Sequence, residues 1–128
     1  MKIKLREVGN VTIIELEGNM TLGEGDEELG QHIQVLLKQG KGNILLKMTE
    51  CPYIDSAGLG EIVRGFINLS RHGGKLKLLD LSKRIEDLLI IVKMRDLFEV
   101  FDNEEAALKS FSWQQVRWAG AKIAPPEE

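Results

Sequence analysis

The stretch that decides the fold of this 128-residue chain runs from Tyr53 to Gly60 and reads Tyr-Ile-Asp-Ser-Ala-Gly-Leu-Gly. It starts as an extended apolar segment and turns into a helix at Asp55-Ser56. The start of a helix leaves backbone N–H groups without partners, and either side chain can accept from them. Only one of the two can be the N-cap. Ser56 is therefore either a structural cap or a solvent-facing hydroxyl that can accept a phosphate.

Two glycines, Gly58 and Gly60, fall inside the first turns of this predicted helix. Glycine in a helix interior costs about 1 kcal/mol relative to alanine, so each needs a reason. The sequence leaves two reasons open. The glycines either let the helix pack tightly on its own sheet, or they leave a bare face that another chain can approach.

Strands and helices alternate along the rest of the chain. Residues 3–8 and 11–17 are rich in β-forming side chains, and the turn signal Gly9-Asn10 between them predicts a hairpin. Apolar residues at helical spacing predict four helices, over about 29–37, 59–67, 85–92 and 107–111. Short apolar runs predict further strands at 43–48, 75–79 and 97–101.

The predicted order is β-β-α-β-α-β-α-β-α, which is an α/β fold with a mixed, mostly parallel sheet. A chain of this length holds one ordinary domain, and we assign it to residues 1–111. The C-terminal segment 112–128 is expected to be a loosely ordered tail. Its Trp113 and Trp118 either fold back onto the core or mark an interface.

Composition excludes several classes of function. The net charge of −3 provides no basic surface for nucleic acid. Cys51 is the single cysteine, and no Cys/His cluster has metal-ligand spacing, so no metal or other cofactor is expected. No apolar run approaches the roughly 20 residues of a membrane span, and the N-terminus lacks a signal peptide. These features predict a cytoplasmic protein that does not insert into a membrane.

An enzymatic role for Ser56 would need a neighbouring base. No histidine lies near it in the sequence, and the pattern is not the Gly-x-Ser-x-Gly elbow of hydrolases. The prediction is a protein that is not an enzyme.

The stretch from Tyr53 to Gly60, with Ile-Leu-Leu at 44–46 before it and Gly-Gly-Lys-Leu-Lys-Leu at 73–78 after it, resembles the STAS domain. More narrowly, it resembles the bacterial anti-sigma factor antagonists, over about residues 3–111. The resemblance implies a partner switch. A protein that is both an anti-sigma factor and a serine kinase would bind the unphosphorylated chain, freeing the sigma factor. Phosphorylation of Ser56 by that kinase would release the chain, and a phosphatase would reset it.

The resemblance also implies a contact surface for that partner. The surface would consist of Asp55, Ser56, Ala57, Gly58 and Leu59, with Glu61 and Arg64 on the exposed face of the helix, and the loop 18–23 as a possible second region. An alternative remains open, because single-domain STAS proteins also serve as small subunits that dock on the ATPase of lipid-transport complexes. In that case Ser56 would be contact surface only.

Overall fold

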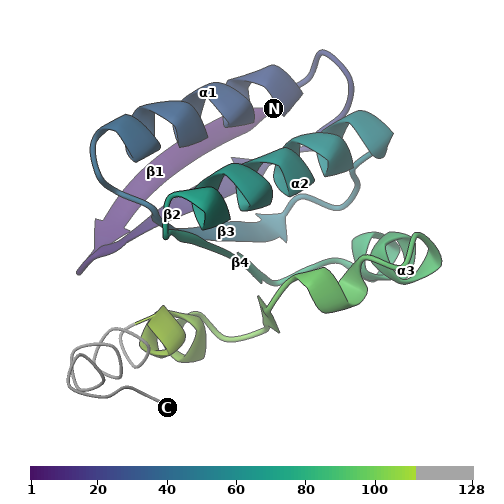
Figure 1. Ribbon diagram of the computed structural model, residues 1–128. Helices are drawn as coiled ribbons and strands as arrows, with labels where there is room; N and C mark the ends of the chain where they lie inside the picture. The colour runs from purple at the N-terminus through teal and green to yellow at the C-terminus, as the bar shows by residue number, and fades with distance from the viewer. Residues whose placement is uncertain (112–128) are drawn as a thin grey trace.

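A computed structural model describes residues 1–111 and shows one five-stranded sheet (Figure 1). Its strands lie in the order β1-β2-β3-β4-β5. Strand β1 is antiparallel to β2, and every other neighbouring pair is parallel. The predicted fold class and the predicted order of elements are both confirmed. The predicted tail 112–128, with Trp113 and Trp118, lies outside the described residues.

The strands are β1 (Lys2–Val8), β2 (Val11–Glu17), β3 (Asn43–Glu50), β4 (Lys75–Leu79) and β5 (Val100–Phe101). The helices are α1 (Asp26–Lys38), α2 (Ser56–Arg71), α3 (Lys83–Ile91), the 3-10 turn η1 (Arg95–Leu97) and the helical residues 104–111. One boundary was wrong: the strand predicted at 97–101 is only two residues long. The 3-10 turn η1 ends at Leu97, so the first residue of the predicted strand belongs to this turn.

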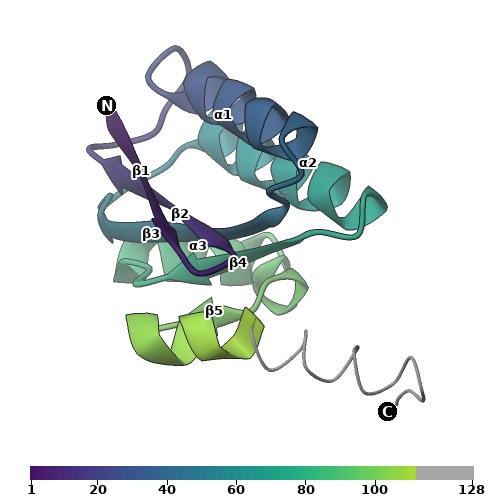
Figure 2. The ribbon, with the colours of Figure 1, turned by 90° about the vertical axis from the view of Figure 1, so that its left-hand side faces the viewer.

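One face of the sheet is covered by α1, α2 and α3. Each of these helices joins two parallel strands that are neighbours in the sheet, and right-handed crossovers in one direction place all three on the same side. A single apolar core confirms this arrangement, because it contains Ile33 of α1, Ile62 of α2 and Ile85 of α3. It also contains Leu46 of the central strand β3. Helices α1 and α2 lie side by side (Figures 1 and 2).

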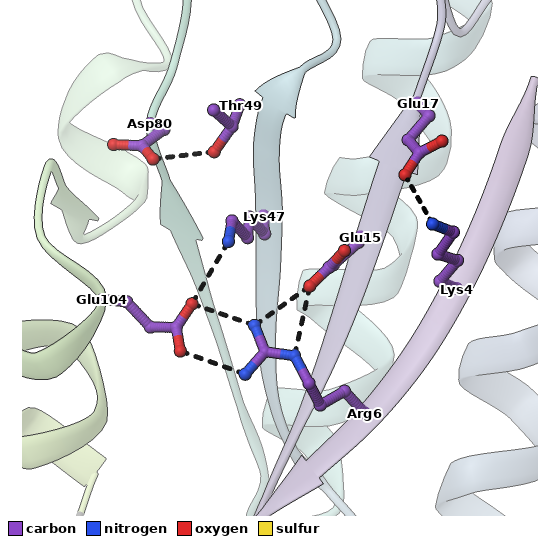
Figure 3. A network of polar contacts seen from close by, with 8 residues as sticks. All are labelled: Lys4, Arg6, Glu15, Glu17, Lys47, Thr49, Asp80 and Glu104. Carbon is purple, nitrogen blue, oxygen red and sulfur yellow. Dashed lines mark hydrogen bonds and ion pairs between the residues drawn. The ribbon is translucent and has the colours of Figure 1, made fainter.

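The other face is covered by the helical residues 104–111 (Figure 2). Ala107 and Phe111 of this helix share a second, smaller core with Leu45 of β3. Beside that core, Glu104 accepts hydrogen bonds from Arg6 of β1 at 2.9 and 3.1 Å and from Lys47 of β3 at 3.3 Å (Figure 3). Charged contacts thus fasten the helical residues 104–111 to strands β1 and β3.

Candidate functional site

Helix α2 begins where Asp55 caps it. The Asp55 carboxylate accepts the Gly58 N–H through Oδ1 and the Leu22 N–H through Oδ2, both at 3.0 Å. These two hydrogen bonds, that of Gly58 first, hold the pKa of Asp55 below its usual range, so the side chain is ionised at neutral pH. Asp55 is therefore the N-cap of α2. Of the two roles that the sequence leaves open for Ser56, the structural cap is excluded.

Ser56 is the first helical residue of α2 and is exposed. Within residues 1–111 its hydroxyl makes no side-chain hydrogen bond, because the capping role belongs to Asp55. The first two turns of α2 contain no lysine or arginine. A phosphate on Ser56 would face the positive end of the helix dipole but would lie beside the Asp55 carboxylate, with no cation on these turns to neutralise it.

The loop between β2 and α1 is fastened to the serine turn. Met20 forms a bridge with Ile54, its N–H donates to the Tyr53 carbonyl at 3.1 Å, and its carbonyl accepts the Asp55 N–H at 3.3 Å. Leu22, in the same loop, is 76% exposed although its backbone is held by Asp55. Leu22 lies in the loop 18–23, the possible second contact region, but the sequence pattern does not distinguish it from its neighbours. The signal that could have indicated Leu22 is that it is a large apolar residue in a glycine-rich loop, outside any strand or helix pattern.

The predicted contact residues divide into two groups. Ser56 and Arg64 are exposed, and Asp55 and Ala57 are partly exposed. Leu59 is only 7% exposed and belongs to the large core. Gly58 is buried too. The Met20 backbone packs closely against it, since a Cβ built on Gly58 would lie 2.4 Å from the Met20 carbonyl oxygen. Leu59 and Gly58 therefore support the exposed residues of the site from the core and are not part of its exposed surface.

Glu61 differs from the expectation that it lies on the exposed face of the helix. Its side chain is 17% exposed, against 64% for Arg64, with which it forms an ion pair. The cause lies on α1, where Gly30 leaves room for it: a Cβ on Gly30 would lie 2.6 Å from the Glu61 carboxylate. Glu61 thus fills the seam between α1 and α2, and Arg64 carries the exposed charge.

A pocket of about 540 Å³ opens where β3, β4 and β5 end. It is lined by Thr49, Asp80, Leu81, Ser82, Glu86, Arg95, Val100, Phe101 and Asp102. Several of its polar groups already bind one another: Thr49 donates to Asp80 at 2.7 Å (Figure 3), and Arg95 donates to Glu86 at 2.6 Å. In residues 1–111 no group of three or more histidine, cysteine or acidic side chains is placed to hold a metal ion.

Other reactive side chains are engaged elsewhere. Cys51 is buried, and burial raises the pKa of its thiol, which suits a structural residue better than a nucleophile. His32 lies 3.8 Å from Glu28, and His72 contacts the Asn68 carbonyl at 2.8 Å. None of the helices within the described part of the chain has the length and apolar character needed to span a bilayer.

Comparison with known sequences supports the predicted resemblance. The family model for the STAS domain matches residues 2–107. A protein named anti-sigma F factor antagonist, from Paenibacillus polymyxa, is 23% identical over 108 residues, which cover 84% of this chain and 92% of that protein. One named anti-sigma-B factor antagonist, from Bacillus subtilis, is 30% identical over 81 residues, which cover 63% and 73% of the two chains.

Solved structures share the fold. The Bacillus cell-fate determinant SpoIIAA in its phosphorylated form superposes with a TM-score of 0.70 at 20% identity, covering 86% of this chain and 99% of that one. A sulfate transporter family protein from Wolinella succinogenes superposes with a TM-score of 0.65 at 21% identity, covering 79% and 84%. At these identities the likeness concerns the fold alone. The family match over residues 2–107, together with this fold, shows that the chain belongs to the STAS domain family.

Proposed function

We propose that this protein is an anti-sigma factor antagonist controlled by phosphorylation of Ser56. In its unphosphorylated form it binds an anti-sigma factor that is also a serine kinase, and so releases a sigma factor. Phosphorylation of Ser56 ends that binding, and a phosphatase restores it. The protein acts in the cytoplasm, as a ligand and a substrate and not as an enzyme. The names of the two sequence relatives support the first part of this proposal.

The observation that carries the proposal is that Asp55, and not Ser56, caps helix α2. Because Asp55 makes the capping hydrogen bond to Gly58, the hydroxyl of Ser56 has no structural duty among the described residues. It stands exposed at the start of α2, where a kinase can reach it. The domain can therefore carry a phosphate there without losing the contacts that begin the helix.

The charge around Ser56 accounts for release. A phosphoserine carries about −1.5 to −2 charges at neutral pH. It would join the ionised Asp55 carboxylate on a surface whose nearest cation on α2 is Arg64, two helical turns away. A partner that fits the unphosphorylated surface would meet two adjacent anions after phosphorylation. Covering the added phosphate charge with a partner surface that fits the neutral hydroxyl costs several kcal/mol of desolvation, which is enough to end binding.

Affinity capture from native cells tests the proposal, with the full-length Ser56→Ala variant as bait and mass spectrometry as the readout. Ser70→Ala, an exposed change at the far end of α2, is the matched control. We expect Ser56→Ala to enrich an anti-sigma factor with a kinase domain, and Ser56→Asp to lose it. Phosphate on Ser56 should be found in the wild-type protein from the same cells.

Two outcomes would contradict the proposal. Equal affinity of the purified kinase for Ser56→Asp and the wild-type protein would remove the phosphorylation switch. Recovery of a transport ATPase, with Ser56 unmodified, would instead favour the alternative in which this chain is a small docking subunit of a transport complex.

A further inference from the structure

Four glycines lie inside the described helices, and three of them have a visible steric reason. A Cβ on Gly58 would lie 2.4 Å from the Met20 carbonyl oxygen. On Gly65 it would lie 2.7 Å from the Ile33 side chain, and on Gly30 it would lie 2.6 Å from Glu61. In each case the missing side chain lets two parts of the fold approach closely.

The fourth helical glycine, Gly60, has no such neighbour. A Cβ built on it would meet nothing within 4 Å outside its own helix and its adjacent residues, and its backbone is not in the left-handed region that favours glycine. Alanine would fit there without strain and would favour the helix. Nothing within the described domain accounts for the choice of glycine at this position.

The position of Gly60 on α2 suggests a reason for the glycine that lies outside the described domain. Residues four apart lie on one face of a helix, so Gly60 is one turn from Ser56 and one turn from Arg64, along the line that leads to Ile67. Ile67 is a large apolar side chain that is 43% exposed. At the other end of the helix, the backbone N–H of Leu22 is bonded to Asp55, the residue before Ser56, and the Leu22 side chain is 76% exposed. The bare position thus lies one turn from the phosphate acceptor, between Ile67 and the loop that contains Leu22.

We propose that Gly60 is a contact residue for the anti-sigma factor, whose main chain crosses α2 at this point within van der Waals distance. This inference rests on the proposed function and adds a residue to its surface. The absence of a Cβ admits the partner's backbone, while Leu22 and Ile67 contact apolar side chains on either side. Aliphatic side chains that bracket a bare helical position form the kind of surface that a main-chain segment with small side chains can lie on.

The test compares Gly60→Ala with Ser70→Ala, both in the full-length Ser56→Ala protein so that phosphorylation does not intervene. Both changes favour the helix, but only the first adds an atom to the proposed contact. We expect Gly60→Ala to raise the Tm of the free protein by about 3–5 °C. We also expect it to weaken binding of the purified anti-sigma factor, captured as above, by at least about tenfold in calorimetric titration. Ser70→Ala should leave the affinity unchanged.

Gly58→Ala, measured alongside, should lower the Tm, because its Cβ collides with the Met20 carbonyl. A lower Tm for Gly60→Ala would overturn the premise that this position is open. A raised Tm with unchanged affinity would overturn the proposed contact while leaving the proposed function intact. Failure of the Ser56→Ala protein itself to bind any anti-sigma factor would overturn both.

Discussion

The two faces of the sheet are built by different means. The face under α1, α2 and α3 is covered by apolar side chains from these three helices and from all five strands. The opposite face has a small apolar core under the helical residues 104–111 and, beside it, a set of ion pairs centred on Arg6 and Glu104 (Figure 3). It also contains Lys77, whose side chain is only 2% exposed. The first face therefore buries most of the apolar core of the domain. The second face binds one helix through a few apolar contacts and several ion pairs.

This contrast separates stability from function. Helix α2 rests on the apolar face through Leu59 and Ile62, so the start of α2 and the serine turn are held by the stronger of the two cores. The exposed line of α2, from Ser56 to Arg64, contributes little to that core. We therefore expect changes in the core to unfold the protein, changes on the second face to have moderate effects, and changes at Ser56 to alter binding alone.

The largest effect should come from a pair of adjacent leucines on β3. Leu45 and Leu46 are both fully buried, but they point to opposite faces of the sheet. Leu46→Ala should lower the free energy of unfolding by about 3–5 kcal/mol, because three helices and the sheet hold its cavity open. Leu45→Ala should cost less, about 2–3 kcal/mol, because the core around it is smaller and a single helix, residues 104–111, covers it and can shift to fill the space. Urea denaturation of both variants measures the difference, and equal losses would refute the contrast between the two faces.

The next effect concerns Lys77. Its Nζ lies 4.7 Å from the Phe111 ring centroid, donates to Ser110 Oγ at 2.9 Å and pairs with Glu99 at 3.3 Å. Lys77→Met keeps the length of the side chain and removes a buried charge. Glu99 is itself exposed and Ser110 Oγ still donates to the Ala107 carbonyl, so both stay satisfied. We expect the variant to be more stable by about 1 kcal/mol at neutral pH. Lys75→Met on the same strand is the control, and a loss of stability in Lys77→Met alone would show that the charge is needed.

The same substitution should change the dependence of stability on pH. Burial, as the largest cause, holds the pKa of Lys77 below its ordinary value of 10.5. Between the lowered pKa and 10.5 the unfolded chain binds more protons than the folded one, so the wild-type protein gains stability as the pH rises through this window. Lys77→Met lacks this gain, and its advantage should shrink as the pH approaches 10.5. Denaturation curves at neutral pH and at about pH 10 test the sign.

Lys77 also marks a limit of prediction from sequence. In residues 75–79 lysines alternate with leucines, which indicates a strand with one solvated face, yet Lys77 is buried. Phe111, more than thirty residues away, covers it, and a local pattern contains no information about that contact. A cap on α2 at Asp55 or Ser56 was predictable because it depends on residues within three positions, although the sequence did not decide between the two. The burial of Glu61 was not, because the space it occupies is provided by Gly30 on another helix.

A smaller effect is expected from the ion pairs on the second face. Glu104→Gln removes the negative charge that pairs with Arg6 and Lys47 but keeps one acceptor oxygen, and it should lower stability by about 0.5–1 kcal/mol, less in high salt. Hydrogen bonds from Arg6, the largest cause, hold the pKa of Glu104 below 4.5, so this contribution is present above pH 4.5 and is lost as the pH falls through the lowered pKa. Glu105→Gln, next to it but 79% exposed, is the control and should change nothing measurable. Equal effects of the two variants would mean that the network in Figure 3 does not hold the helix.

The smallest effect on stability should accompany the largest effect on function. Ser56→Asp places a carboxylate at the positive end of the α2 dipole, which is favourable, and beside Asp55, which is unfavourable. The two contributions oppose each other, and the hydroxyl that is lost had no hydrogen bond among residues 1–111, so the free energy of unfolding should change by less than about 0.5 kcal/mol. Thermal unfolding and partner titration on the same sample measure both quantities. If Ser56→Asp loses the partner only because the domain unfolds, the serine belongs to the scaffold; if it loses the partner while the Tm stays constant, the surface around Ser56 acts independently of the core that supports it.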